Sequence, residues 1–119
     1  MIRESEVINI LGEKIPEINA ELEKLPHTGN VYKSVQCFAD FTKELIHTGN
    51  LKGVKHCLNV AETMLEDGSL AVKNAIENVF LFSLSAVLDL TSPVSQAVKE
   101  MLRGPLRKEY NRQTTHGGI

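Results

Sequence analysis

The sequence predicts an all-α protein with five to six helices in antiparallel hairpins, either closed into a bundle or stacked like a short solenoid. Apolar residues recur at helical steps of three and four along nearly the whole chain. Glycine, proline and asparagine separate these stretches, and the short connections favour antiparallel neighbours. The length of 119 residues fits one domain. We expect this domain to span residues 1–113 and residues 114–119 to form a flexible tail.

The first helical region covers residues 8–25 and contains a proline. Pro16 lacks an amide N–H and clashes with the preceding turn, which predicts a break with Pro16 opening the second segment. Two amphipathic helices follow, at residues 31–47 and 51–66. His-Thr-Gly-Asn precedes each of them, at 27–30 and 47–50. In this motif glycine is expected to be left-handed and asparagine to cap the next helix.

A fourth helix is predicted over residues 70–88. Gly68 is expected to end the previous helix in a left-handed conformation, and Ser69 to cap this one. The stretch 79–88 is apolar on nearly all sides, which is typical of a helix at the centre of a fold. It is too short to span a bilayer.

Two further helices complete the predicted architecture. Thr91 or Ser92 is expected to cap a helix that starts at Pro93. Gly104-Pro105 ends that helix before a short last one. The C-terminal segment is locally basic but lacks a nucleic-acid-binding module, so its charges are expected to complement helix ends or pair with acids.

Composition argues against several classes of function. The net charge is −2 and the pI about 6.1, so we expect neither a nucleic-acid nor a membrane partner. The acidic residues that follow Met1 do not fit a secretory signal, which favours the cytoplasm. Cys37 and Cys57 fall on helices near the apolar side and are expected to be reduced, buried thiols.

No residue pattern indicates catalysis. The histidines His27, His47, His56 and His116 show no metal-ligand spacing with one another or with cysteine. A cysteine–histidine nucleophile pair could form only across the fold, and buried thiols are inert. We therefore expect no catalytic residue, no cofactor and no metal ion.

Two polar groups are the candidates for partner binding. Asn74, Glu77 and Asn78 share one stripe of the helix at 70–88. That stripe faces either solvent or a groove that presents amides and a carboxylate to a partner. Glu62, Glu66 and Asp67 form an acidic cluster at the end of the helix at 51–66, where negative charge is unfavourable, and Glu62 and Glu66 are its candidate partner-binding residues.

Several motifs resemble a family of small, uncharacterised, all-helical bacterial proteins. They are 38–43 (FADFTK), Gly49-Asn50, 61–68 (AETMLEDG), 74–80 (NAIENVF) and the Leu106, Glu109 and Tyr110 pattern. The resemblance covers about residues 32–110. It implies helical hairpins in a bacterial, non-catalytic protein and assigns no functional residue.

These observations predict a non-catalytic protein–protein interaction module of the bacterial cytoplasm, similar to an immunity protein or an adaptor. Its partner is expected to be another protein. A homodimer that covers the apolar fourth helix, notably Leu81, is a further option. The alternative function is a small-ligand-binding protein or an enzyme with a pocket beside the helix at 70–88.

Overall fold

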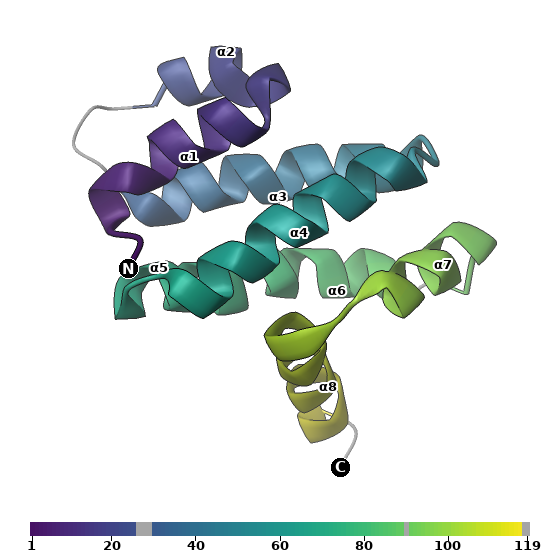
Figure 1. Cartoon of the computed structure of the whole chain (residues 1–119). Helices are drawn as coiled ribbons and strands as arrows, with labels where there is room; N and C mark the ends of the chain where they lie inside the picture. Colours follow the sequence, from purple (N-terminus) through teal and green to yellow (C-terminus); the bar gives the residue numbers. More distant parts are fainter. Residues whose placement is uncertain (26–29, 90, 118–119) are drawn as a thin grey trace.

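A computed structural model describes residues 1–25, 30–89 and 91–117 (Figure 1). These residues form helices and no strand, which confirms the all-α fold class. The α-helices are α1 (Val7–Lys14), α2 (Asn19–Glu23), α3 (Val31–His47), α4 (Leu51–Asp67), α5 (Leu70–Ala75), α6 (Phe82–Leu88), α7 (Pro93–Met101) and α8 (Gly104–Gly117). Short 3₁₀ turns at Glu4–Glu6 and Pro16–Ile18 precede α1 and α2.

A π-helical segment, Ile76–Leu81, joins α5 and α6 into one continuous helix, Leu70–Leu88. The described residues therefore form seven helices, slightly more than predicted. The additional helix comes from the break at Pro16, which separates α1 from α2 as expected.

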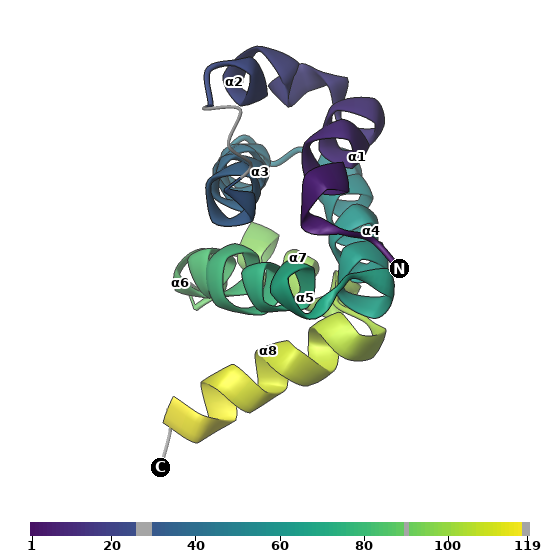
Figure 2. The ribbon, with the colours of Figure 1, turned by 90° about the vertical axis from the view of Figure 1, so that its left-hand side faces the viewer.

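The helices lie in successive layers (Figures 1 and 2). The α1–α2 hairpin forms one outer layer, α3 and α4 form the next, and helix 70–88 with α7 forms a third. α8 crosses the far side of helix 70–88 and contacts α4. α4 runs across these layers and contacts α3, helix 70–88, α7 and α8.

The core is centred on two stacked aromatic rings. Phe38 of α3 and Phe80 of the π segment are both fully buried, with ring centroids 4.5 Å apart and an interplanar angle of 24°. Such a stacked pair stabilises the folded chain by more than the burial of its apolar area alone. The two rings hold α3 and helix 70–88 in register.

Other helices cover helix 70–88 on all but one of its faces. It packs on α3, α4, α7 and α8, and Phe80, Leu81 and Leu84 are fully buried. Phe82, by contrast, is 68% exposed. Helix 70–88 therefore lies at the centre of the fold, as predicted, with one exposed face at Phe82. By length and composition alone the helix could cross a membrane, but core helices of soluble proteins meet the same criterion.

The junction between α3 and α4 matches the motif-based prediction. Gly49 has a φ of 73°, and the Asn50 side chain accepts a hydrogen bond from the Gly53 N–H at 3.0 Å. In the first copy of the motif, Asn30 accepts from the Tyr32 N–H at 2.9 Å. Residues 27–29 of that copy lie outside the described residues.

Gly68 does not adopt the predicted left-handed conformation. Its φ is −75°, and it forms an isolated bridge with Ile2. The Ile2 N–H donates to the Asp67 carbonyl, and the Ser69 N–H donates to the Ile2 carbonyl, both at 2.7 Å. Glycine is required here for space, because a Cβ atom would collide with the Met64 carbonyl and with Val72.

This difference predicts unequal costs for two alanine substitutions. Gly49→Ala is expected to cost about 1 kcal/mol, because its left-handed φ disfavours alanine although no atom lies within 4 Å. Gly68→Ala is expected to cost about 2 kcal/mol from overpacking alone. Urea unfolding measures both, and hydrogen exchange at the Ser69 amide should accelerate only in Gly68→Ala. Equal exchange in the two variants would contradict this account.

The C-terminal helix is longer than predicted. α8 runs to Gly117, so the predicted tail at 114–119 overlaps its last turn, while residues 118–119 lie outside the described residues. Arg107 of α8 donates to the Leu102 carbonyl at 2.8 Å and to the Lys99 carbonyl at 2.7 Å. A basic side chain thus binds the C-terminal carbonyls of α7, as the dipole argument predicts.

Candidate functional site

A wide groove of about 730 Å³ separates the α2 region from α3. We call it the α2–α3 groove. It lies on the side of α3 away from α8 (Figure 2). Its lining residues are Glu17, Ile18, Glu21, Lys24, Leu25, Lys33, Gln36, Cys37, Asp40, Phe41 and Glu44.

The floor of the groove is apolar. Cys37 and Phe41 lie one helical turn apart on α3, and Ile18 and Leu25 come from the opposite wall. Ile18 is buried, whereas the other three are half-buried and packed against the core. Apolar surface therefore remains accessible between two helical walls.

The rim carries acidic side chains on both walls. Glu17 and Glu21 are four residues apart on one wall, and Asp40 and Glu44 are four residues apart on the other. All four are exposed. Charged rims around an apolar floor are typical of grooves that bind peptides or helices.

Two lysines also line the groove, and one of them forms an ion pair with a glutamate of the rim. Lys24 Nζ lies 3.1 Å from Glu21 Oε1. Lys33 lies at the start of α3, three turns before Glu44. Lys43, just outside the lining, places its Nζ 3.5 Å from Asp40 Oδ1. Glu17 and Glu44 are therefore the rim acids that form no ion pair with a described residue.

The two cysteines are free thiols in different environments. Cys37 is half-buried in the groove, where burial and then the charge of Glu21 raise its pKa. Cys57 of α4 is fully buried, and burial raises the pKa of its thiol to about 11. The prediction of a buried thiol is confirmed for Cys57, whereas Cys37 is partly accessible. Neither environment favours the thiolate that a nucleophile needs.

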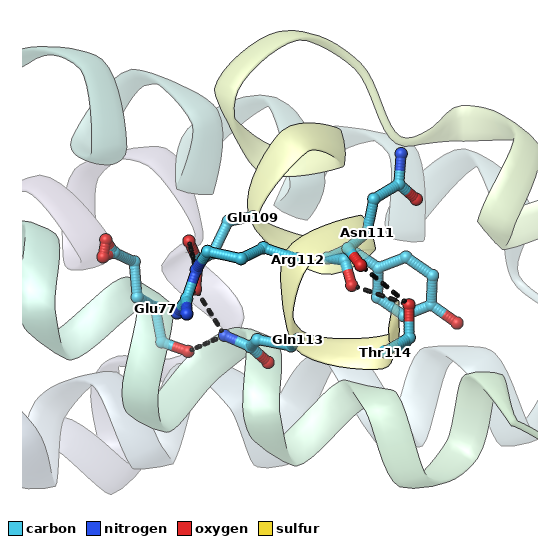
Figure 3. A network of polar contacts seen from close by, with 7 residues as sticks. Glu77, Glu109, Asn111, Arg112, Gln113 and Thr114 are labelled. Atoms are coloured by element: carbon cyan, nitrogen blue, oxygen red, sulfur yellow. Dashed lines mark hydrogen bonds and ion pairs between the residues drawn. The ribbon is translucent and has the colours of Figure 1, made fainter. Parts of the chain in front are cut away.

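The structure places Glu77 of the predicted polar stripe beneath α8 (Figure 3). The Gln113 Nε2 donates to the Glu77 carbonyl and to Glu109 Oε2, both at 2.9 Å, and Glu109 also pairs with Arg112. Burial and then Glu109 raise the pKa of Glu77, while the hydrogen bond from Arg112 lowers the pKa of Glu109. Asn74 is half-buried and Asn78 is exposed.

The predicted acidic cluster faces the start of α8. Glu62 is half-buried, and a Cβ atom on Gly104 would lie 2.9 Å from Glu62 Oε1 and 4.0 Å from Glu66 Oε1. Burial and then Glu66 raise the pKa of Glu62, while Arg103 opposes that rise. The acids at the C-terminal end of α4 therefore lie beside the N-terminal end of α8, and their surroundings on balance disfavour the charged form of Glu62.

The two histidines whose side chains the structure describes lie at separate places in the fold. His47 is exposed at the end of α3, and His56 Nε2 hydrogen-bonds the Lys14 carbonyl at 2.6 Å, which ties α4 to α1. His27 lies outside the described residues, as does the side chain of His116. Within the described part of the chain, no group of three histidine, cysteine or carboxylate side chains could hold a metal ion.

A smaller cleft of about 320 Å³ lies beside helix 70–88, where the alternative prediction expects a pocket. Charged side chains of α8 form much of its lining, which consists of Leu65, Glu77, Pro105, Lys108, Glu109 and Arg112. Leu81, the residue predicted to face a second subunit, is instead buried in the chain's own core. Phe82 is the exposed neighbour that could meet a second copy.

Sequence reasoning missed the α2–α3 groove. Its local signal is present in α3, where the apolar pair Cys37 and Phe41 runs beside the acidic pair Asp40 and Glu44. This pattern resembles the ordinary edge of an amphipathic helix, and only the position of α2 turns that edge into a groove wall.

The chain matches one protein family of unknown function. No curated protein and no solved structure matches the chain. A family defined as a domain of unknown function, DUF7674, matches residues 8–117, nearly the whole chain. This match confirms the resemblance to an uncharacterised domain family, and the chain therefore belongs to the DUF7674 family.

Proposed function

We propose that the chain is a non-catalytic protein–protein interaction module whose partner docks in the α2–α3 groove. The observation that carries this proposal is the accessible apolar floor between two acidic walls. α3 is a rigid support for such a site, because its opposite face carries the fully buried Phe38 and Ala39. Docking would cover the floor and leave the acids at a polar rim.

We also propose a bacterial, cytoplasmic setting and a role like that of an immunity protein or an adaptor. The two free thiols support the cytoplasmic part of this proposal, because they suit a reducing compartment. An adaptor or inhibitor of this kind needs a stable docking surface and no reactive group.

Site-specific photo-crosslinking tests the docking surface in the cells that naturally contain the chain. A photoreactive phenylalanine analogue replaces Gln36 at the rim, and in a matched control it replaces the exposed Glu100 of α7. We expect one discrete protein adduct from position 36, none from position 100, and loss of the adduct with Phe41→Ser. Equal labelling from both positions, or an adduct that survives Phe41→Ser, would refute docking in the groove.

The residues predicted from the sequence define a second proposed contact surface. They are Asn74, Glu77, Asn78, Glu62 and Glu66. It ranks second because Glu77 and Glu62 lie against α8, which leaves Asn78 as the exposed member of the stripe. If the photoreactive analogue forms an adduct from position 78 and none from position 36, the docking surface lies on this face.

A small-ligand-binding protein or an enzyme is the second candidate function, and the cleft beside helix 70–88 favours it. The raised pKa of Glu77 would place a carboxyl group with altered acidity at the cleft. Native mass spectrometry separates the two candidates. A bare polypeptide mass supports the interaction module, and a retained small molecule that is lost in Glu77→Ala supports the cleft.

A further inference from the structure

We infer that the occupant of the α2–α3 groove is an amphipathic helix of the partner protein, with lysine or arginine residues flanking its apolar face. The inference rests on the proposed function and specifies the chemistry of the partner. It follows from the length of the groove, the spacing of its apolar floor and the sign of its rim.

The dimensions suit a helix. The groove follows α3 from Lys33 to Glu44, a length of about 16 Å at 1.5 Å per residue. An occupant helix of about three turns spans that distance. Cys37 and Phe41 repeat at one-turn spacing, which complements apolar side chains placed at i, i+3, i+4 and i+7.

The charge of the rim selects a basic occupant. Glu17 and Glu21 lie on one side of the floor, and Asp40 and Glu44 lie on the other. Glu21 pairs with Lys24 and Asp40 pairs with Lys43, so among the described residues Glu17 and Glu44 provide one uncompensated carboxylate on each side. A helix seated between them would place the flanks of its apolar face against carboxylates on both sides. Basic flanks would be attracted, whereas acidic flanks, like a nucleic-acid backbone, would be repelled.

The chain contains its own reporter of occupancy. Cys37 is half-buried in the floor of the groove, whereas Cys57 is fully buried in the core of the same protein. An occupant that covers the floor would slow alkylation of Cys37. Alkylation of Cys57 would stay slow whether or not the groove is occupied, so it monitors unfolding in the same sample.

The probes are three synthetic helical peptides of about 14 residues, or four turns. They share leucines at i, i+3, i+4 and i+7 and carry lysine, glutamine or glutamate on the flanks. Fluorescence anisotropy measures the affinity of each peptide. Mass spectrometry measures the rate at which iodoacetamide alkylates Cys37.

We expect the lysine peptide to bind at least tenfold more tightly than the glutamate peptide, with an affinity that falls as salt rises. It should also slow alkylation of Cys37. The double variant Asp40→Asn/Glu44→Gln should weaken the lysine peptide about three- to tenfold. The matched control Glu100→Gln, on exposed α7, should leave the affinity unchanged.

Each contrary outcome is informative. Equal binding and equal Cys37 protection by the lysine and glutamine peptides would overturn the basic partner, yet the groove would remain a docking site. Lysine-peptide binding without Cys37 protection would reveal nonspecific attraction and overturn the inference. Failure of all three peptides would also overturn it, while the crosslink from position 36 would still decide the proposed function. The rim variants change only exposed side chains, so the test does not depend on a variant that disturbs the core.

Discussion

Replacing Phe80 with alanine is expected to lower the free energy of unfolding by about 3–5 kcal/mol. Phe80 is fully buried and stacks on Phe38, so the substitution removes a large apolar side chain and an aromatic pair. A domain of this size has only about 5–15 kcal/mol of stability. Urea unfolding followed by circular dichroism measures the loss as a fall in the midpoint.

Phe82 provides the matched control. It is two residues further along the same helix but 68% exposed, so Phe82→Ala should change stability by no more than about 0.5 kcal/mol. If Phe80→Ala does not fold, Phe80→Leu serves instead, with a smaller loss. Similar losses at positions 80 and 82 would contradict the assignment of Phe80 as the centre of the core.

The contrast between these two phenylalanines marks a limit of sequence reasoning. The stretch 79–88 is apolar on nearly every side, so its periodicity does not say which face is covered. The π segment shifts the helical register at residues 76–81, and no local pattern signals it. The face that turns inward is decided by α3, α4, α7 and α8.

Helix boundaries, in contrast, were accessible from the sequence. The predicted helices 31–47 and 51–66 agree with α3 and α4 to within one residue. Their caps explain this agreement, because Asn30 and Asn50 act on backbone groups two or three residues away. Capping contacts of this kind can be predicted from the sequence, because they join residues that are close together in it.

Long-range packing accounts for the features that the sequence could not reveal. Gly68 was predicted to be left-handed, yet its extended conformation follows from pairing with Ile2 at the other end of the α1–α4 segment. The sequence marks Glu62 and Glu77 as candidate contact residues, but it does not show that Gly104 of α8 lies beside Glu62 or that Gln113 of α8 binds the Glu77 carbonyl. The α2–α3 groove likewise depends on how a short helix rests against a long one.

Ionisation of Cys57 alone is expected to lower the free energy of unfolding by about 2–3 kcal/mol as the pH rises from about 9 to about 11. Burial raises the pKa of this thiol in the folded chain from its ordinary value of 9.0 to about 11. Above pH 9 the unfolded chain loses the proton while the folded chain keeps it, so deprotonation favours unfolding. The stabilisation is complete below pH 9 and is lost as the pH passes through 11.

Cys57→Ala isolates this contribution from that of other groups that lose a proton at alkaline pH, such as Tyr110, whose pKa is raised by burial. The variant should be less stable than the parent at neutral pH, because it leaves a small cavity. Its urea midpoint should nevertheless fall less steeply between pH 9 and pH 11. Cys37→Ala, at the half-buried thiol of the α2–α3 groove, should keep most of the parent's slope. If Cys57→Ala and the parent lose stability in parallel, the buried thiol is not the group that links folding to alkaline pH.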